Sequence, residues 1–267
     1  MQVPQLEDAQ LNQVWARLDL VMDPELDEPV TDMGFIEAVS IVAPATGQNA
    51  CTVTISFRLP TYWCSPNFAF LMAEGIKREV EDLPWVGQAI VTLQDHMAAE
   101  EMNAAINSGA TFGSVFADLH PGEDLSALRE KFDQKAFQRR QEVVLKTLIA
   151  QGISPLAIVT MPLATLKAIP FADPENARQK SRYLDLLQAK NLASNPDDIA
   201  LPTYQGTPIG DDFQTYMGLL RSVRINMEFS GSLCRGLKRS RYQQADLSGD
   251  VPILVDYAAP LPLHACR

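Results

Sequence analysis

The segment from Phe57 to Leu83 constrains the fold more than any other part of the chain. Residues 51–57, which lead into it, alternate apolar and polar side chains and predict a half-buried strand. A short loop follows, and then Ser65 and Pro66 predict a helix start, because Ser caps helices well and Pro fits the first helical position. Apolar residues at helical spacing give this helix one buried face: Phe68, Leu71, Met72, Ile76, Val80 and Leu83.

The order of strand, loop and helix places Cys64 just before a helix N-terminus. Unpaired N–H groups and the helix dipole favour a thiolate over a thiol there. A thiolate is the form of cysteine that binds metal ions or attacks electrophiles. The alternative is a small apolar residue packed under the loop, since free cysteine is among the most buried residue types. Position alone leaves both interpretations open.

The flanking segments complete a small α/β unit. Apolar spacing predicts a helix over residues 7–22, and we expect strands over residues 35–41, 51–57 and 89–93. The resulting α-β-β-α-β order predicts a small sandwich with helices packed on a sheet. Gly34, just before the first strand, is expected to supply a positive φ or a close approach. Cys51 falls on the core side of the second strand, so we interpret it as structural.

Charge is distributed unevenly along the chain, which supports a division into domains. Residues 1–100 hold 15 of the 33 acidic residues and only 4 of the 22 basic ones, so the net charge of −11 arises there. We predict an α/β domain over residues 1–96, a helix and linker over 97–124, and a mainly α domain over 125–267. An acid-rich first domain argues against nucleic acid as a partner.

Several absences narrow the class of protein. No apolar run approaches the roughly 18 residues that a membrane-spanning helix needs. The N-terminal residues lack the apolar core of a secretory signal. The four cysteines are widely spaced, unlike a disulfide framework or a zinc finger. These features predict a reduced, cytoplasmic protein with no membrane partner.

Basic residues gather near the end of the second half, which we expect to contain helices over residues 125–152, 174–190 and 211–229. Three interpretations stay open for this group: docking on the acidic first domain, contact with an acidic client or a phosphate, and redox or metal chemistry at Cys234. Nearby cations would favour the thiolate form of Cys234. The candidate partner-binding residues are Arg221, Arg224, Arg235, Lys238, Arg239 and Arg241.

Three motifs follow one another in the first domain: DPEL at Asp23–Leu26, TDMGF at Thr31–Phe35 and T-x-x-C at Thr61–Cys64. With their separations and the expected element order, residues 8–96 resemble the SufT/PaaD-type domain found in proteins of iron–sulfur cluster assembly. Two departures alter access to Cys64. Ser65 stands where the family usually has Pro directly after the cysteine, and Tyr62-Trp63 replaces the usual small residues.

The resemblance implies that Cys64 is the reactive thiolate, with Asp23 and Glu25 as further metal ligands at the same end of the sheet. The cargo would be iron or an iron–sulfur cluster, held transiently. One cysteine cannot hold a cluster alone, since clusters usually need four ligands, so a homodimer, a client metalloprotein or small thiols would supply the rest. The expected supporting residues are Thr61, Tyr62, Trp63, Asp32, Gly34 and His96.

Two of these assignments have plain alternatives. Asp23 and Glu25 could simply tie down the loop backbone, as Asp often does in turns. His96 and Glu100 are spaced to meet as an i, i+4 pair on one helix, either at a metal or on the surface.

The first functional hypothesis is a non-catalytic assembly factor whose helical half recognises the client. RLPTYWC and KAFQRRQE also faintly resemble accessory proteins encoded with bacterial soluble diiron monooxygenases, which suggests such an enzyme as the client. The alternative is a metal-free scaffold or chaperone with Tyr62 and Trp63 as its contact patch. A thiol enzyme would need His96 as its base. The chain lacks Glu-x-x-His and His-x-x-x-His, so we do not expect it to be a diiron or zinc enzyme itself.

Overall fold

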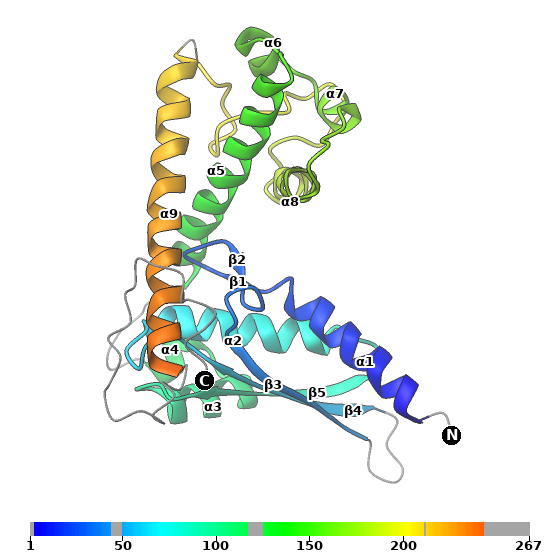
Figure 1. Cartoon of the computed structure of the whole chain (residues 1–267), viewed down its shortest axis with the longest axis vertical. Coiled ribbons are helices and arrows are strands. Elements are labelled where there is room, and N and C mark those ends of the chain that lie inside the picture. Colours follow the sequence, from blue (N-terminus) through cyan, green and yellow to red (C-terminus); the bar gives the residue numbers. More distant parts are fainter. Residues whose placement is uncertain (1–2, 44–49, 117–124, 211, 243–267) are drawn as a thin grey trace, which may run out of the picture. The chain divides into compact units, whose positions relative to one another are not determined.

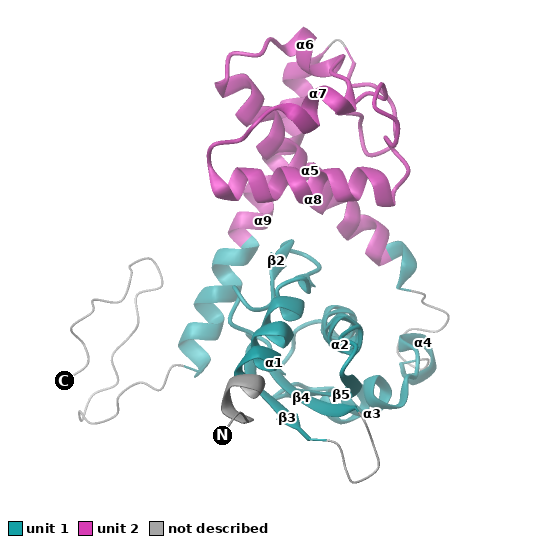
Figure 2. Ribbon diagram, turned by 90° about the vertical axis from the view of Figure 1, so that its right-hand side faces the viewer, with its two compact units in different colours: residues 1–127, 230–267 teal, residues 128–229 magenta. Residues whose placement is uncertain are grey.

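A computed structural model describes residues 3–43, 50–116, 125–210 and 212–242. The chain divides into two compact units, coloured separately in Figure 2. Unit 1 comprises residues 1–127 and 230–267, and unit 2 comprises residues 128–229. The expected boundary left all of residues 125–267 in one helical domain, whereas here the last described turns of the chain, from Ser230, belong to unit 1.

Unit 1 is built on a three-stranded sheet in the order β3-β4-β5 (Figure 1). Strands β3 (Ile36–Val42) and β4 (Cys51–Arg58) are antiparallel, and β4 pairs in parallel with β5 (Val86–Gln94). A parallel neighbour requires a crossover connection, and α2 (Pro66–Glu81) provides it. Alternate residues of β4, namely Val53, Ile55 and Phe57, are fully buried, as the period-two pattern predicts.

Helices cover this sheet. Helix α1 (Val3–Leu18) and α2 lie on one face in Figure 2, and α3 (Ala99–Ser108) with the short α4 (Phe112–Val115) follows β5. The buried face of α2 includes Met72, Ile76 and Val80. The predicted α-β-β-α-β order is therefore confirmed.

The segment between α1 and β3 departs from the expected boundary at one end and agrees with expectation at the other. Helix α1 ends at Leu18, not at residue 22, because the next residues form a two-residue antiparallel ladder of β1 (Met22–Asp23) with β2 (Glu28–Pro29). Gly34 has a φ of 66°, the left-handed conformation expected before the strand.

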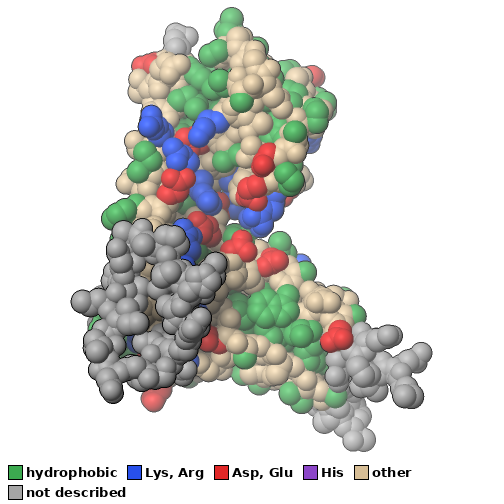
Figure 3. Space-filling view, viewed as in Figure 1, with side chains coloured by type: hydrophobic (Ala, Val, Ile, Leu, Met, Phe, Trp, Pro, Cys, Tyr) green, Lys and Arg blue, Asp and Glu red, His purple; other side chains and the backbone are tan. Residues whose placement is uncertain are grey.

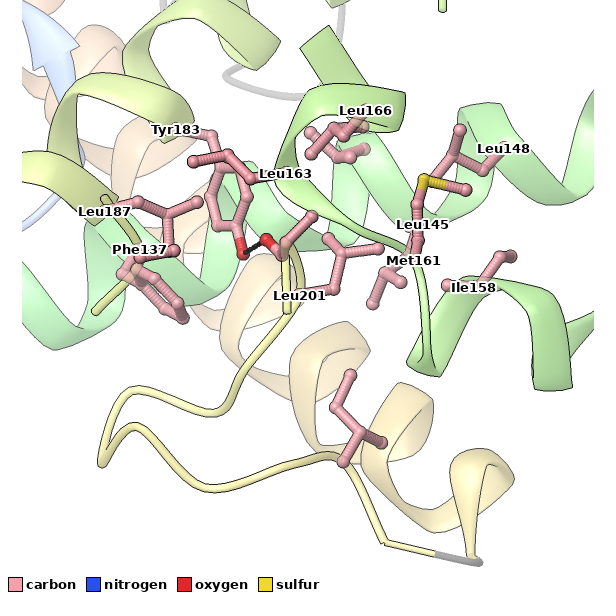
Figure 4. Packing of buried hydrophobic residues seen from close by; sticks show 14 of the residues in the cluster. Phe137, Leu145, Leu148, Ile158, Met161, Leu163, Leu166, Tyr183, Leu187 and Leu201 are labelled. Carbon is pink, nitrogen blue, oxygen red and sulfur yellow. Dashed lines mark hydrogen bonds between the residues drawn. The ribbon is translucent and has the colours of Figure 1, made fainter. Parts of the chain in front are cut away.

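Unit 2 is helical, as predicted for this part of the chain. It contains most of α5 (Ser126–Ala150), then α6 (Pro155–Val159), α7 (Leu163–Ala168) and α8 (Pro174–Ala189), and the first half of α9 (Phe213–Tyr242). Figure 4 shows Tyr183 packed among apolar side chains such as Phe137 and Leu187. The Tyr183 hydroxyl donates to the carbonyl of Ala200 at 3.0 Å and accepts from Gln141, so this buried polar atom is paired.

Helix α9 is longer than the sequence pattern predicts. Apolar spacing predicts a helix over residues 211–229, but α9 continues to Tyr242 through Gly231 and Gly236. Glycine costs about 1 kcal/mol in a helix interior. The continuation is stabilised by side-chain contacts that its C-terminal half makes with the rest of unit 1, which are described below.

Candidate functional site

Cys64 lies in the loop between β4 and α2, two residues before the first helical residue, Pro66. Its side chain is half-buried and its thiol is free. The hydroxyl Oγ1 of Thr61 is 3.2 Å from the sulfur, and the Cys64 N–H donates to the Thr61 carbonyl at 3.4 Å. Thr61 and Cys64 of the T-x-x-C motif therefore form one local turn, in which the hydroxyl contacts the sulfur.

The two aromatic residues of the loop do not form a lid. Trp63 is 74% exposed and Tyr62 is 38% exposed, and their rings meet edge to face with centroids 5.1 Å apart. Both rings therefore present area to solvent next to Cys64, and a partner could contact them.

His96 holds the Cys64 loop in place through the backbone. Its Nδ1 accepts a hydrogen bond from the Ala98 N–H at 3.2 Å, so the ring proton is on Nε2, which donates to the Cys64 carbonyl at 2.7 Å. Burial lowers the pKa of His96, and the Arg241 charge acts in the same direction. Both ring nitrogens are thus occupied in a neutral imidazole. His96 precedes α3 and points inward, so the expected helical pair with Glu100 does not form.

Asp23 shapes the loop over residues 23–34, called the acidic loop because it also carries Glu25, Asp27, Glu28 and Asp32. Its Oδ1 accepts from the N–H groups of Glu25 at 2.9 Å and Leu26 at 3.0 Å. Burial raises the pKa of Asp23 to about 6, against the opposing effect of these two hydrogen bonds. The carboxylate therefore ties down the loop backbone, which was the alternative to metal ligation. Glu25 is half-buried and Asp32 is exposed.

The six candidate basic residues separate into two groups. In unit 1, Arg235 pairs with Glu28 at 2.6 Å, Lys238 with Glu37 at 3.3 Å, and Arg241 with Asp95 at 2.9 Å. These three side chains are engaged with acids of the first 96 residues. Arg239 of the same helix is exposed.

The other two bases belong to unit 2. Arg224 pairs with the buried Glu142 and with Glu228, both at 2.8 Å. Arg221 lines a surface pocket of about 470 Å³ together with Lys146 and Arg224. Figure 3 shows acidic and basic side chains gathered together over this unit. Four of the six candidate residues thus belong to unit 1 and two to unit 2.

Cys234 lies on α9, next to Arg235, which pairs with Glu28 of the acidic loop. Burial raises the pKa of its thiol to about 11, and the charges of Asp23, Cys64 and Glu25 add to this effect, while Arg235 opposes it. The expectation that nearby cations favour its thiolate was therefore wrong, because burial and the nearby acidic groups outweigh the opposing charge of Arg235. Sequence reasoning did not place this part of α9 on unit 1, since 207 residues separate Arg235 from Glu28 and no local motif joins them.

The described residues do not form a complete metal-binding site. Within the described ranges, no three His, Cys, Asp or Glu side chains come together in a way that could hold a metal ion. None of the described helices is both long and apolar enough to cross a membrane.

Comparison with known proteins agrees with the motifs of unit 1. Residues 11–91, from α1 to β5, match the family model described as iron-sulfur cluster assembly protein. A search of curated proteins found no match to the chain. The matched segment contains the acidic loop and Cys64, so residues 11–91 are similar to the iron–sulfur cluster assembly family.

Proposed function

We propose that this protein carries iron or an iron–sulfur cluster on Cys64 and delivers it to a client metalloenzyme. The observation that supports this most is the free Cys64 thiol, in a loop ordered by Thr61 and His96, within the segment that matches the assembly family. A soft thiolate suits iron. The role is that of an assembly factor, and no catalytic step is needed.

Incomplete ligation fits delivery better than storage. An iron–sulfur cluster usually takes four protein ligands, and the described residues do not provide a complete set. External ligands from the client, from small thiols or from a second copy of the chain would complete it. Cargo held in this way can leave when the client offers better ligands. Asp23 and Glu25 would line the entrance, and the free cysteines suit a reducing cytoplasm.

The client would contact the exposed ring of Trp63 and the helical unit. Trp is favoured where partner proteins bind, and Trp63 directly precedes Cys64. The resemblance of RLPTYWC and KAFQRRQE to accessory proteins of diiron monooxygenases makes such an enzyme the client to test first. The same exposed rings also favour the second candidate function, a metal-free chaperone that holds the client in a competent shape.

Anaerobic reconstitution with ferrous iron and sulfide tests the proposal. We expect iron and sulfide to be retained by the wild type and by Cys51→Ser, a control at the start of β4, and to be lost in Cys64→Ser. Absorption spectra and iron counts per chain provide the measurement. A wild-type chain that stays metal-free but still binds the client would instead establish the chaperone function.

A further inference from the structure

Helices α5 and α9 form a surface pocket of about 470 Å³ in unit 2, and every side chain that lines it comes from one of these two helices. The lining includes the ion pair between Arg224 and Glu142, whose Nε and Oε2 atoms are 2.8 Å apart. Glu142 is only 2% exposed, and a carboxylate buried this deeply needs a cationic partner. This contact therefore holds α5 and α9 against each other at the pocket.

Two further cations lie one helical turn away from this ion pair. Lys146 follows Glu142 by four residues on α5, and Arg221 precedes Arg224 by three residues on α9. Both spacings put side chains on one face of a helix. The two helices run in opposite directions within unit 2 (Figure 1), so both steps lead the same way along the helix pair. Lys146 and Arg221 accordingly line the same pocket.

The charges of Lys146 and Arg221 are not offset by acidic partners. Within the described parts of the chain, neither side chain forms an ion pair, whereas Arg224 pairs with both Glu142 and Glu228. Both side chains are exposed, so neither is needed to fill the core of unit 2. Positive charges at one pocket repel each other, and an anion bound between them would relieve this repulsion.

The pocket also has open space on its α9 side. A Cβ atom added at Gly218 would meet no heavy atom within 4 Å beyond the backbone of its own helix. Met217, next to it, is half-buried and lines the pocket with an apolar side chain. A ligand held by the cations therefore has room for an uncharged part beside these two residues.

We propose that this pocket binds the phosphate group of a small organic molecule, with Lys146 and Arg221 as its cationic ligands. Arg and Lys are the side chains that recognise phosphate in proteins, Arg as a planar fork and Lys as a point charge. A phosphate monoester carries about −1.5 to −2 charges at pH 7, which matches two unpaired cations better than a single carboxylate does. The volume lies in the range of about 300–1,000 Å³ that is typical of small-molecule sites. The inference does not depend on Cys64 and gives unit 2 a ligand of its own.

Isothermal titration calorimetry of the full chain with phenyl phosphate tests this site, in a phosphate-free buffer of low ionic strength, because salt screens exposed charges. We expect saturable binding in wild type. In Arg221→Gln and in Lys146→Gln the affinity should weaken by about tenfold, because each substitution removes one charged hydrogen bond to the phosphate. Arg239→Gln is the matched control. It removes the same charge from an exposed position of the same helix, in unit 1, and should leave the affinity unchanged.

Gly218→Leu tests the open space without changing any charge. Leucine favours a helix more than glycine does, and the added Cβ atom meets no neighbour, so the helix should be kept. Circular dichroism and thermal unfolding check this. The leucine side chain should fill the space beside Met217, and we expect binding of phenyl phosphate to be lost. Unchanged binding would show that the ligand does not occupy this pocket.

Three other outcomes overturn the proposal. Wild type that shows no saturable binding has no such site. Equal affinities in Arg221→Gln and Arg239→Gln mean that phenyl phosphate follows net charge alone. Tighter binding of glutarate, a dicarboxylate, than of phenyl phosphate assigns the pocket to carboxylates instead. None of these variants changes Cys64, so each outcome leaves the proposed function in iron delivery intact.

Discussion

The Asp23 carboxylate destabilises the folded protein when it is charged, because it is buried. Its carboxylate is almost fully buried, and its pKa is raised from an ordinary value of 3.8 to about 6. The folded protein therefore binds this proton more tightly than the unfolded chain does. The stabilisation due to protonation is fully present below pH 3.8 and is lost as the pH rises through about 6.

Asp23→Asn should remove this pH dependence. Asparagine keeps a carbonyl oxygen to accept from the N–H groups of Glu25 and Leu26, but it has no charge to bury. Relative to wild type, the variant should gain up to about 3 kcal/mol in the free energy of unfolding between pH 4 and pH 7. Urea unfolding at both pH values measures this gain. An unchanged difference between the two proteins would show that Asp23 is not held in a desolvated position.

Residues near the main motifs were easier to predict than distant ones. Gly34 and the turn around Cys64 follow from local rules of backbone conformation and helix capping, so their geometry was predictable from a few neighbouring letters. The pairing of Arg235 with Glu28 was not, because it depends on how a helix far along the chain packs on unit 1. No spacing within the sequence encodes that contact.

Among the elements, the His96 side chain helps to join the segment after β5 to the loop before α2. Replacing it with Phe preserves apolar bulk but leaves the Cys64 carbonyl without its donor. We expect a loss of about 1–3 kcal/mol in the free energy of unfolding and faster alkylation of Cys64, since its loop is no longer held. Denaturant titration and the rate of reaction with iodoacetamide provide the two readouts.

Met97→Ala is the matched control for this change. The Met97 side chain is half exposed, and its N–H donates to the Tyr62 carbonyl whatever the side chain. Both readouts should stay close to wild type. Equal effects of the two substitutions would mean that His96 acts only through packing.

The ends of the helices show where apolar periodicity gives the wrong boundary. The β4 and α2 patterns were regular, and both elements lie where they were predicted. The end of α9 was placed 13 residues too early, because Gly231 and Gly236 weaken the local helix signal. Their cost is offset by ion pairs to acids some 200 residues away, which a pattern of neighbouring residues does not reveal.

For the whole molecule, the two units have separate cores, so a defect in one core should stay local. Tyr183→Phe removes the hydroxyl that pairs with Ala200 and Gln141 in unit 2. We expect unit 2 to lose about 1–3 kcal/mol, because two buried polar groups lose a partner. The alkylation rate of Cys64, in unit 1, should not change. A changed rate would mean that the core of unit 2 also stabilises the Cys64 loop.

The order in which the chain is synthesised decides when helix α9, which contributes to both units, can pack on unit 1. Residues 11–91 leave the ribosome well before α9 is made, and at typical elongation speeds the interval is on the order of ten seconds. During that interval the nascent domain lacks the ion pairs that α9 makes with Glu28, Glu37 and Asp95. These contacts form only after α9 has been made, so a chain cut short by the ribosome before α9 would fold its α/β domain without them.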